Sequence, residues 1–171
     1  MKKFMAIALS ALMAMSVFTA CGGDEGEKQP EAPAYDVAKV LETIETAAPV
    51  SNSTAVNEEY MDFIGIDAEM YDAYAGSYCP MTPGVDIILV VQAKEDKVAD
   101  VETALTARRD EIYSANENYP GPLTDKAQAG RIVVKGNYVV LAIAGNDEVV
   151  EAEGAEKAYE VVDAAIDEAF K

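Results

Sequence analysis

The segment Val85–Lys94, VDIILVVQAK, constrains the fold most, because it is apolar on both of its faces. Successive side chains of a strand point to opposite faces, so the odd-numbered positions from 85 to 93 form one fully apolar face. The other face is apolar at Ile88 and Val90 and polar at its ends. A strand that is apolar on both faces is usually central in its sheet. The sequence therefore predicts a central strand over residues 85–94.

A β-hairpin is predicted nearer the C-terminus, within GRIVVKGNYVVLAIAGN, residues 130–146. Its centre, Gly136-Asn137, is a two-residue turn of the type that accepts positive φ angles. A turn at this position pairs residue 135 with residue 138. The apolar side chains at 134 and 139, and at 132 and 141, are then expected to face each other across the two strands.

Helical spacing of apolar residues predicts helices in the remaining segments. Asp36 is a suitable N-cap for the first helix, which ends before Pro49. The other predicted helices cover residues 58–64, residues 68–75 with a cap at Asp67, a long stretch from about 96 to 118, and a C-terminal stretch from about 155. A local hairpin with segregated helices favours an α+β fold of two layers, with the helices on a small, mainly antiparallel sheet.

Residues 1–20 predict a secretory signal peptide. Two lysines at the start precede FMAIALSALMAM, residues 4–15. This order of a basic start and a short apolar run is typical of a secretory leader. The run is too short to span a membrane, which takes about 20 residues.

The end of this leader, FTAC, resembles the lipobox of bacterial lipoproteins, in which small residues precede a cysteine. Thr19 and Ala20 fit the pattern, and Phe18 stands where leucine is preferred. The resemblance implies that Cys21 receives a diacylglyceryl group and becomes the new N-terminus. Two acyl chains hold a protein on a bilayer where one chain is marginal, so the lipid on Cys21 is expected to act as a membrane anchor.

Residues 21–35 are rich in Gly, Pro and charge and contain almost nothing to bury before Tyr35. That composition is typical of a flexible linker. Residues 36–171 are long enough for one domain with its own core. We therefore expect a signal peptide over 1–20, an acidic linker over 21–35 and a single α+β domain over 36–171.

The charge balance excludes some partners. The chain holds 13 Lys and Arg against 31 Asp and Glu, which gives a net charge of −18. Such a chain repels nucleic acid, so no nucleic-acid partner is expected. Histidine is absent, which removes the commonest general base and most zinc and iron ligand sets. The acidic stretches lack the spacing of a known calcium loop, and neither a metal nor a catalytic residue is predicted.

Two adjacent arginines, Arg108 and Arg109, are candidates for ligand binding. Arg108 lies on the apolar stripe of the long predicted helix, and Arg109 lies at the edge of that stripe. An arginine in such a place extends its charged end to solvent or pairs with a buried carboxylate. An arginine pair can also bind a ligand carboxylate or phosphate. We expect a carboxylate of the same domain to bind Arg108, with ligand binding as the alternative.

Tyrosines form the second group of candidates. Tyr71 and Tyr74 are the tentative ligand-binding members, and with the other tyrosines of this part of the chain they could line an aromatic groove. Ordinary packing, with each hydroxyl reaching water, is the competing interpretation. Further tyrosines available to such a groove are Tyr60, Tyr78, Tyr113 and Tyr119. Cys79 has no C-x-x-C partner and no histidine to activate it, so we expect an inert, partly buried thiol.

A lipobox, a short acidic linker, a long Arg-bearing helix, Tyr119-Pro120 and GNYVVLAI occur in this order. Over residues 36–171 this arrangement resembles a family of bacterial lipoproteins with a small domain of unknown function, found mostly in Gram-positive anaerobes. The resemblance implies a domain facing outside the cytoplasm on a lipid anchor in the cell membrane. It supplies no ligand and no catalytic residue.

These features together predict a cell-envelope lipoprotein whose domain is a non-enzymatic binding or docking module. Its expected partners are the bilayer, through the anchor, and an envelope protein or a small molecule. A small-molecule binding protein would show an enclosed pocket, whereas a docking module would show an exposed apolar patch. A carboxylate-based hydrolase is the remaining alternative, and it would need two acids facing each other in a cleft.

Overall fold

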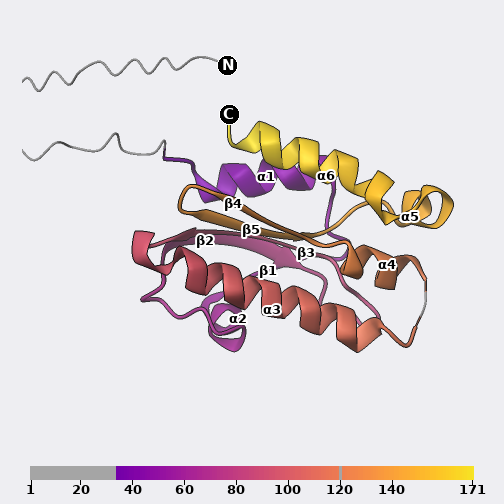
Figure 1. The fold of residues 1–171 in the computed structure, drawn as a ribbon, viewed down its shortest axis with the longest axis horizontal. Coiled ribbons are helices and arrows are strands. Elements are labelled where there is room, and N and C mark those ends of the chain that lie inside the picture. The colour runs from indigo at the N-terminus through magenta and orange to yellow at the C-terminus, as the bar shows by residue number, and fades with distance from the viewer. Residues whose placement is uncertain (1–33, 120) are drawn as a thin grey trace, which may run out of the picture. The chain divides into compact units, whose positions relative to one another are not determined.

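The computed structural model describes residues 34–119 and 121–171 (Figure 1). The predicted leader 1–20 and the predicted lipidation site Cys21 lie outside the described residues. Tyr35, the last residue of the predicted linker, packs into the domain. Its ring makes edge-on contacts with Tyr138 and Phe170, and its hydroxyl donates to the Phe170 carbonyl oxygen at 2.9 Å. The chain therefore joins the packed domain at Tyr35, beside the C-terminus.

The centre of the domain is a five-stranded antiparallel sheet with the strand order β1-β2-β3-β5-β4. β3, the predicted central strand, lies between β2 and β5, and its first five residues are buried on both faces. The strands are β1 (Thr54–Ala55), β2 (Tyr71–Tyr78), β3 (Ile87–Ala93), β4 (Arg131–Lys135) and β5 (Tyr138–Ile143). The prediction of a central strand is confirmed.

The β4–β5 hairpin has the predicted register. Lys135 pairs with Tyr138, and the pairs at 134–139 and 132–141 follow. Gly136 has a φ of 63°, a left-handed conformation that glycine adopts without strain. The turn chemistry in the sequence is therefore sufficient to set this register.

Helices cover both faces of the sheet. α1 (Val37–Ala47) and α6 (Ala155–Ala169) lie on one face, and α2 (Glu58–Phe63) and α3 (Val98–Asn116) lie on the other (Figure 1). A 3₁₀ turn, η1 (Glu95–Lys97), precedes α3, and two short helices, α4 (Pro122–Gln128) and α5 (Asp147–Glu153), complete the domain. The α+β class is confirmed. The helices form two layers with the sheet between them, so the domain has three layers rather than the expected two.

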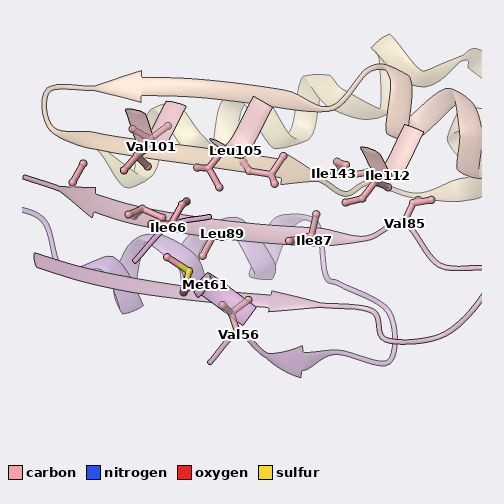
Figure 2. Close-up of a cluster of buried hydrophobic side chains, with 14 of the residues drawn as sticks. Val56, Met61, Ile66, Val85, Ile87, Leu89, Val101, Leu105, Ile112 and Ile143 are labelled. Atoms are coloured by element: carbon pink, nitrogen blue, oxygen red, sulfur yellow. The ribbon is translucent and has the colours of Figure 1, made fainter. Parts of the chain in front are cut away.

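The third layer follows from β3 itself. Leu89 and its odd-numbered neighbours pack against Leu105 and Ile112 of α3, as Figure 2 shows. Ile88 and Val90 pack against α1 and α6 on the opposite face. A strand that is apolar on both faces needs an apolar layer on each. One helical layer would leave half of β3 in water.

The predicted helix over residues 68–75 is wrong, because this segment contains most of strand β2. Tyr71 pairs with Ala93, and Tyr78 pairs with Ile87, with an irregularity in the register after Tyr71. Asp67 caps only a turn, in which its Oδ1 accepts from the Glu69 amide at 2.9 Å. Helical spacing of the apolar residues suggested a helix, and pairing with the buried β3 overrides that local preference. Helices α4 and α5 were not predicted.

Gly76 of β2 lies so close to β3 that no side chain fits there. A Cβ at this position would lie 2.8 Å from the Ile88 carbonyl oxygen and 2.8 Å from Leu89 Cδ1. Gly76→Ala is therefore expected to lower the free energy of unfolding by about 1–3 kcal/mol through overpacking. Asp72→Ala, at an exposed position of the same strand, is the control, and denaturant unfolding is the measurement. Equal stability of the two variants would contradict the close approach.

Candidate functional site

Arg108 lies on α3 where this helix faces α2. Its Nε donates to the Tyr60 hydroxyl at 3.1 Å, and its Nη1 donates to Glu111 Oε2 at 2.7 Å. The predicted pairing of Arg108 with a carboxylate of the same domain is confirmed. Burial lowers the pKa of Arg108, but Tyr60 and Glu111 outweigh this effect and raise the pKa overall. Arg108 therefore stays charged, and its charge is balanced within the domain.

Aromatic rings surround this guanidinium. Arg108 Cζ lies 5.6 Å from the centroid of the Tyr60 ring and 5.5 Å from that of Phe63, within the range of cation–π contacts. The Tyr60 ring also packs against Tyr78, with centroids 4.5 Å apart. Burial raises the pKa of Tyr60, although Arg108 opposes this rise, so the Tyr60 hydroxyl is protonated at neutral pH. The Phe63 side chain remains 66% exposed.

A hollow of about 200 Å³ lies next to Arg108, between the loop 82–84 and the C-terminal half of α3. We call it the α3 groove, and its lining residues are Thr82, Pro83, Gly84, Arg108, Glu111, Ile112, Ala115 and Asn116. Three large hydrophobic residues beside it are exposed, and we call them the rim: Phe63 at 66%, Met81 at 56% and Tyr119 at 76%.

Chain connections and contacts place the rim residues next to residues that line the groove. Phe63 contacts Arg108, as given above. Met81 directly precedes the loop 82–84. The Tyr119 amide donates to the Asn116 carbonyl oxygen at 2.8 Å. An open groove with exposed aromatic and aliphatic neighbours is the usual form of a protein-binding surface.

The structure distributes the four predicted ligand-binding residues over three places. Tyr71 and Tyr74 form an edge-on pair with centroids 5.2 Å apart, and burial raises the pKa of both. Tyr74 is four residues from Tyr78 along β2, which corresponds to about 13 Å. The Tyr71–Tyr74 pair is therefore separated from the contact between Tyr78 and Tyr60 beside Arg108. Arg109 binds Asp110 Oδ1 through Nε and Nη2 at 2.9 and 2.7 Å. Of the four, only Arg108 lines the α3 groove, and ligand binding by all four stays a prediction.

Sequence reasoning missed a buried ion cluster around Lys126 of α4. Lys126 is 1% exposed, and its Nζ lies 2.6 Å from Asp86 Oδ1 and 2.5 Å from Asp147 Oδ1. The contact with Asp86 Oδ1 is an ion pair without hydrogen-bond geometry, and Asp86 Oδ2 accepts from the Ser51 amide at 3.3 Å. The ammonium group of Lys126 pairs with two carboxylates from different segments, so this cluster joins α4 to the start of β3 and to α5. Asp86 in an apolar strand was the available signal, because a buried carboxylate requires a partner.

Two other kinds of site can be assessed in the described part of the chain. Within residues 34–119 and 121–171 there is no group of three His, Cys, Asp or Glu side chains that could hold a metal ion. In the same ranges no helix combines the length and hydrophobicity needed to cross a membrane. Cys79 is partly buried and carries a free thiol.

A family model described as a domain of unknown function, DUF4358, matches residues 42–144. The chain belongs to the DUF4358 family. This result confirms the domain part of the resemblance, over a shorter range than 36–171. No curated protein and no solved structure matches the chain.

The α3 groove and the Lys126 cluster differ in how much of each lies within the matched part of this DUF4358 protein. All lining and rim residues of the α3 groove lie within residues 42–144. The ion cluster crosses the end of the match, since Lys126 and Asp86 lie inside it and Asp147 lies outside. The groove is thus built entirely from the family domain, whereas the Lys126 cluster ties that domain to α5.

The Lys126 cluster leads to a prediction for the stability of the DUF4358 domain. Lys126→Met leaves Asp86 buried without its cation, and we expect the free energy of unfolding to fall by about 3–5 kcal/mol. The double variant Lys126→Met/Asp86→Leu removes both charges, so its free energy of unfolding should fall less than that of Lys126→Met. Lys157→Met, which removes an exposed pair with Glu160, should change stability much less. Chemical denaturation that found Lys126→Met as mild as Lys157→Met would contradict a structural role for the cluster.

Proposed function

We propose that this protein is a lipoprotein anchored to a bacterial cell membrane through a diacylglyceryl group on Cys21. Its DUF4358 domain faces outside the cytoplasm and acts as a non-enzymatic docking module for another envelope protein. The basic start, the short apolar run and the sequence FTAC before Cys21 support the anchor. The α3 groove and its rim support docking.

The observation that carries the docking proposal is the exposure of three large hydrophobic side chains around one groove. Phe63, Met81 and Tyr119 are each more than half exposed, although the domain has two well-packed cores available to apolar residues. Aromatic side chains beside an arginine are the residue types that dominate binding energy at protein interfaces. The rim therefore fits an interface better than an inert surface.

The size of the hollows favours docking over small-molecule binding. Pockets for drug-sized ligands measure about 300–1,000 Å³ and enclose most of the ligand. The α3 groove measures about 200 Å³, below this range, whereas two other hollows measure about 280 and 330 Å³, at its lower end. The volume of the α3 groove suits side chains inserted from a partner surface.

The position of the groove suits an anchored domain. The chain joins the domain at Tyr35, which contacts Tyr138, and Tyr138 pairs with Gln92 near the end of β3. The groove includes Gly84, which precedes the other end of β3. The residues from 85 to 92 span about 20 Å or more along the strand. The groove and the point of attachment thus lie toward opposite ends of the sheet.

The anchor can be tested by fractionation of cells that express the full chain. Cys21→Ala removes the sulfur that would carry the lipid, so we expect the protein to leave the membrane fraction. Cys79→Ala is the matched control and should remain there. Retention of Cys21→Ala on the membrane would contradict the lipid anchor.

Docking can be tested by site-specific photocrosslinking in the intact envelope. A photoreactive phenylalanine at position 63 of the anchored protein should give an adduct of defined mass. The same amino acid in place of Val161, an exposed residue of α6, is the control and should not give that adduct. Tyr119→Asp should abolish the adduct from position 63, because it places a charge on the rim. Absence of an adduct at position 63, or the same adduct from both positions, would contradict docking at the groove.

A further inference from the structure

Helix α4 does not line the α3 groove, but it is tied to both of its walls. We propose that α4 is a brace that sets the separation of these walls, with Thr124 and Lys126 as positioning residues for docking. One wall is the C-terminal half of α3, and the other is the loop 82–84. This inference rests on the docking function proposed above and adds the residues that hold its site in shape.

Thr124 ties α4 to the wall formed by α3. Its hydroxyl donates a shared hydrogen bond to the carbonyl oxygens of Asn116, at 2.9 Å, and Tyr119, at 2.7 Å. The last carbonyl groups of a helix have no partner within the helix, so Thr124 supplies one at the end of α3. Thr124 is only 7% exposed, so loss of this bond would leave carbonyl groups poorly compensated by water. One hydroxyl thus holds a lining residue and a rim residue together.

Lys126 ties α4 to the other wall, the loop 82–84. Its Nζ lies 2.6 Å from Asp86 Oδ1, and the Asp86 carbonyl oxygen accepts from the Cys79 amide at 2.8 Å. Residues 79 and 86 thus close the base of this loop. The loop is compact above its base, because a Cβ on Gly84 would lie 2.8 Å from Cys79 Sγ. A shift of Asp86 is therefore expected to carry the loop with it.

The hydrophobic core holds the floor of the groove, whereas its open side needs another link. Ile112 of α3 and Val85, which follows the loop, are both buried in the same core cluster. Thr82 and Pro83 on one wall and Tyr119 on the rim are exposed to solvent. The path through α4 supplies a link between these exposed parts. A groove whose walls are held in place in advance loses less conformational entropy when a partner binds.

Asp147 allows the brace to be separated from the rest of the ion cluster. It is the second carboxylate on Lys126, at 2.5 Å, and it belongs to α5. The path between the two walls does not pass through α5. Asp147→Asn keeps the pair of Lys126 with Asp86 and removes only the ion pair with α5. It is therefore a matched control for variants that break the brace.

The separation of the walls can be measured on the purified full-length protein in detergent. Spin-labelled amino acids in place of Thr82 and Ala115, exposed lining residues on opposite walls, report it by pulsed electron paramagnetic resonance. Thr124→Val removes the hydroxyl and keeps the shape of the side chain, whereas Thr124→Ser keeps the hydroxyl. We expect Thr124→Val to broaden the distance distribution between the labels. Thr124→Ser and Asp147→Asn should leave it unchanged.

The two ends of the brace act in series, so their effects should not add. Lys126→Met breaks the link at the loop, and Thr124→Val breaks it at α3. The double variant should therefore give a distribution no broader than that of the broader single variant. Thermal unfolding checks that each variant is folded, and Thr124→Val by itself tests the brace if Lys126→Met is unfolded. Additive broadening in the double variant would indicate two independent links and overturn the brace.

Docking gives a second readout, through the photoreactive residue at position 63 in the intact envelope. We expect Thr124→Val to lower the adduct yield about 3- to 10-fold, because only molecules with the correct wall separation bind the partner. Thr124→Ser and Asp147→Asn should keep the yield of the unmodified protein. A loss of the same size in Asp147→Asn would indicate general loosening of the domain and overturn the positioning role.

The possible failures are distinguishable. Unchanged label distances in Thr124→Val, with the adduct from position 63 retained, would overturn the brace and leave docking intact. Broadened distances with an unchanged adduct yield would overturn the role of Thr124 in docking. Absence of any adduct from position 63 in the unmodified protein would overturn the docking function and, with it, the role of α4 in docking.

Discussion

The structure depends on a single strand that is buried on both faces. β3 has its odd-numbered residues in the core with α3 and its even-numbered residues in the core with α1 and α6. Each face loses its contact with water only if a helical layer covers it. The sandwich of helix, sheet and helix and the order of its layers follow from this requirement.

The same strand sets the position of the α3 groove. The chain leaves β3 at Ala93, turns through η1 and runs back over the sheet as α3, so the C-terminal half of α3 lies over the start of β3. The loop 82–84 enters β3 at that end, and Lys126 binds Asp86 there. Two segments that are distant in sequence therefore meet and form the groove. The buried ion pair fixes the entry of β3, because separating its partners would leave a charge without compensation.

The sequence predicted features whose interacting residues lie close together in the chain. It missed features whose interacting residues lie far apart in the chain. β3 and the β4–β5 hairpin were predictable because their alternation and the Gly136-Asn137 turn are local features. The pairing of Arg108 was predictable because Glu111 lies one helical turn away. β2 was mistaken for a helix because its pairing with β3 is not visible in its own residues. The contacts of Lys126 with Asp86 and of Phe63 with Arg108 join residues about forty positions apart, and only the fold brings them together.

We propose that the α3 groove is an interface when the protein is in its own envelope. Hydrogen–deuterium exchange of the anchored protein, compared between native membranes and purified protein in detergent, tests it most directly. We expect slower exchange in native membranes for segments 62–66, 80–85 and 115–119, with unchanged exchange in α6. Equal exchange of these segments in both preparations, or protection confined to α6, would rule out an interface at the groove.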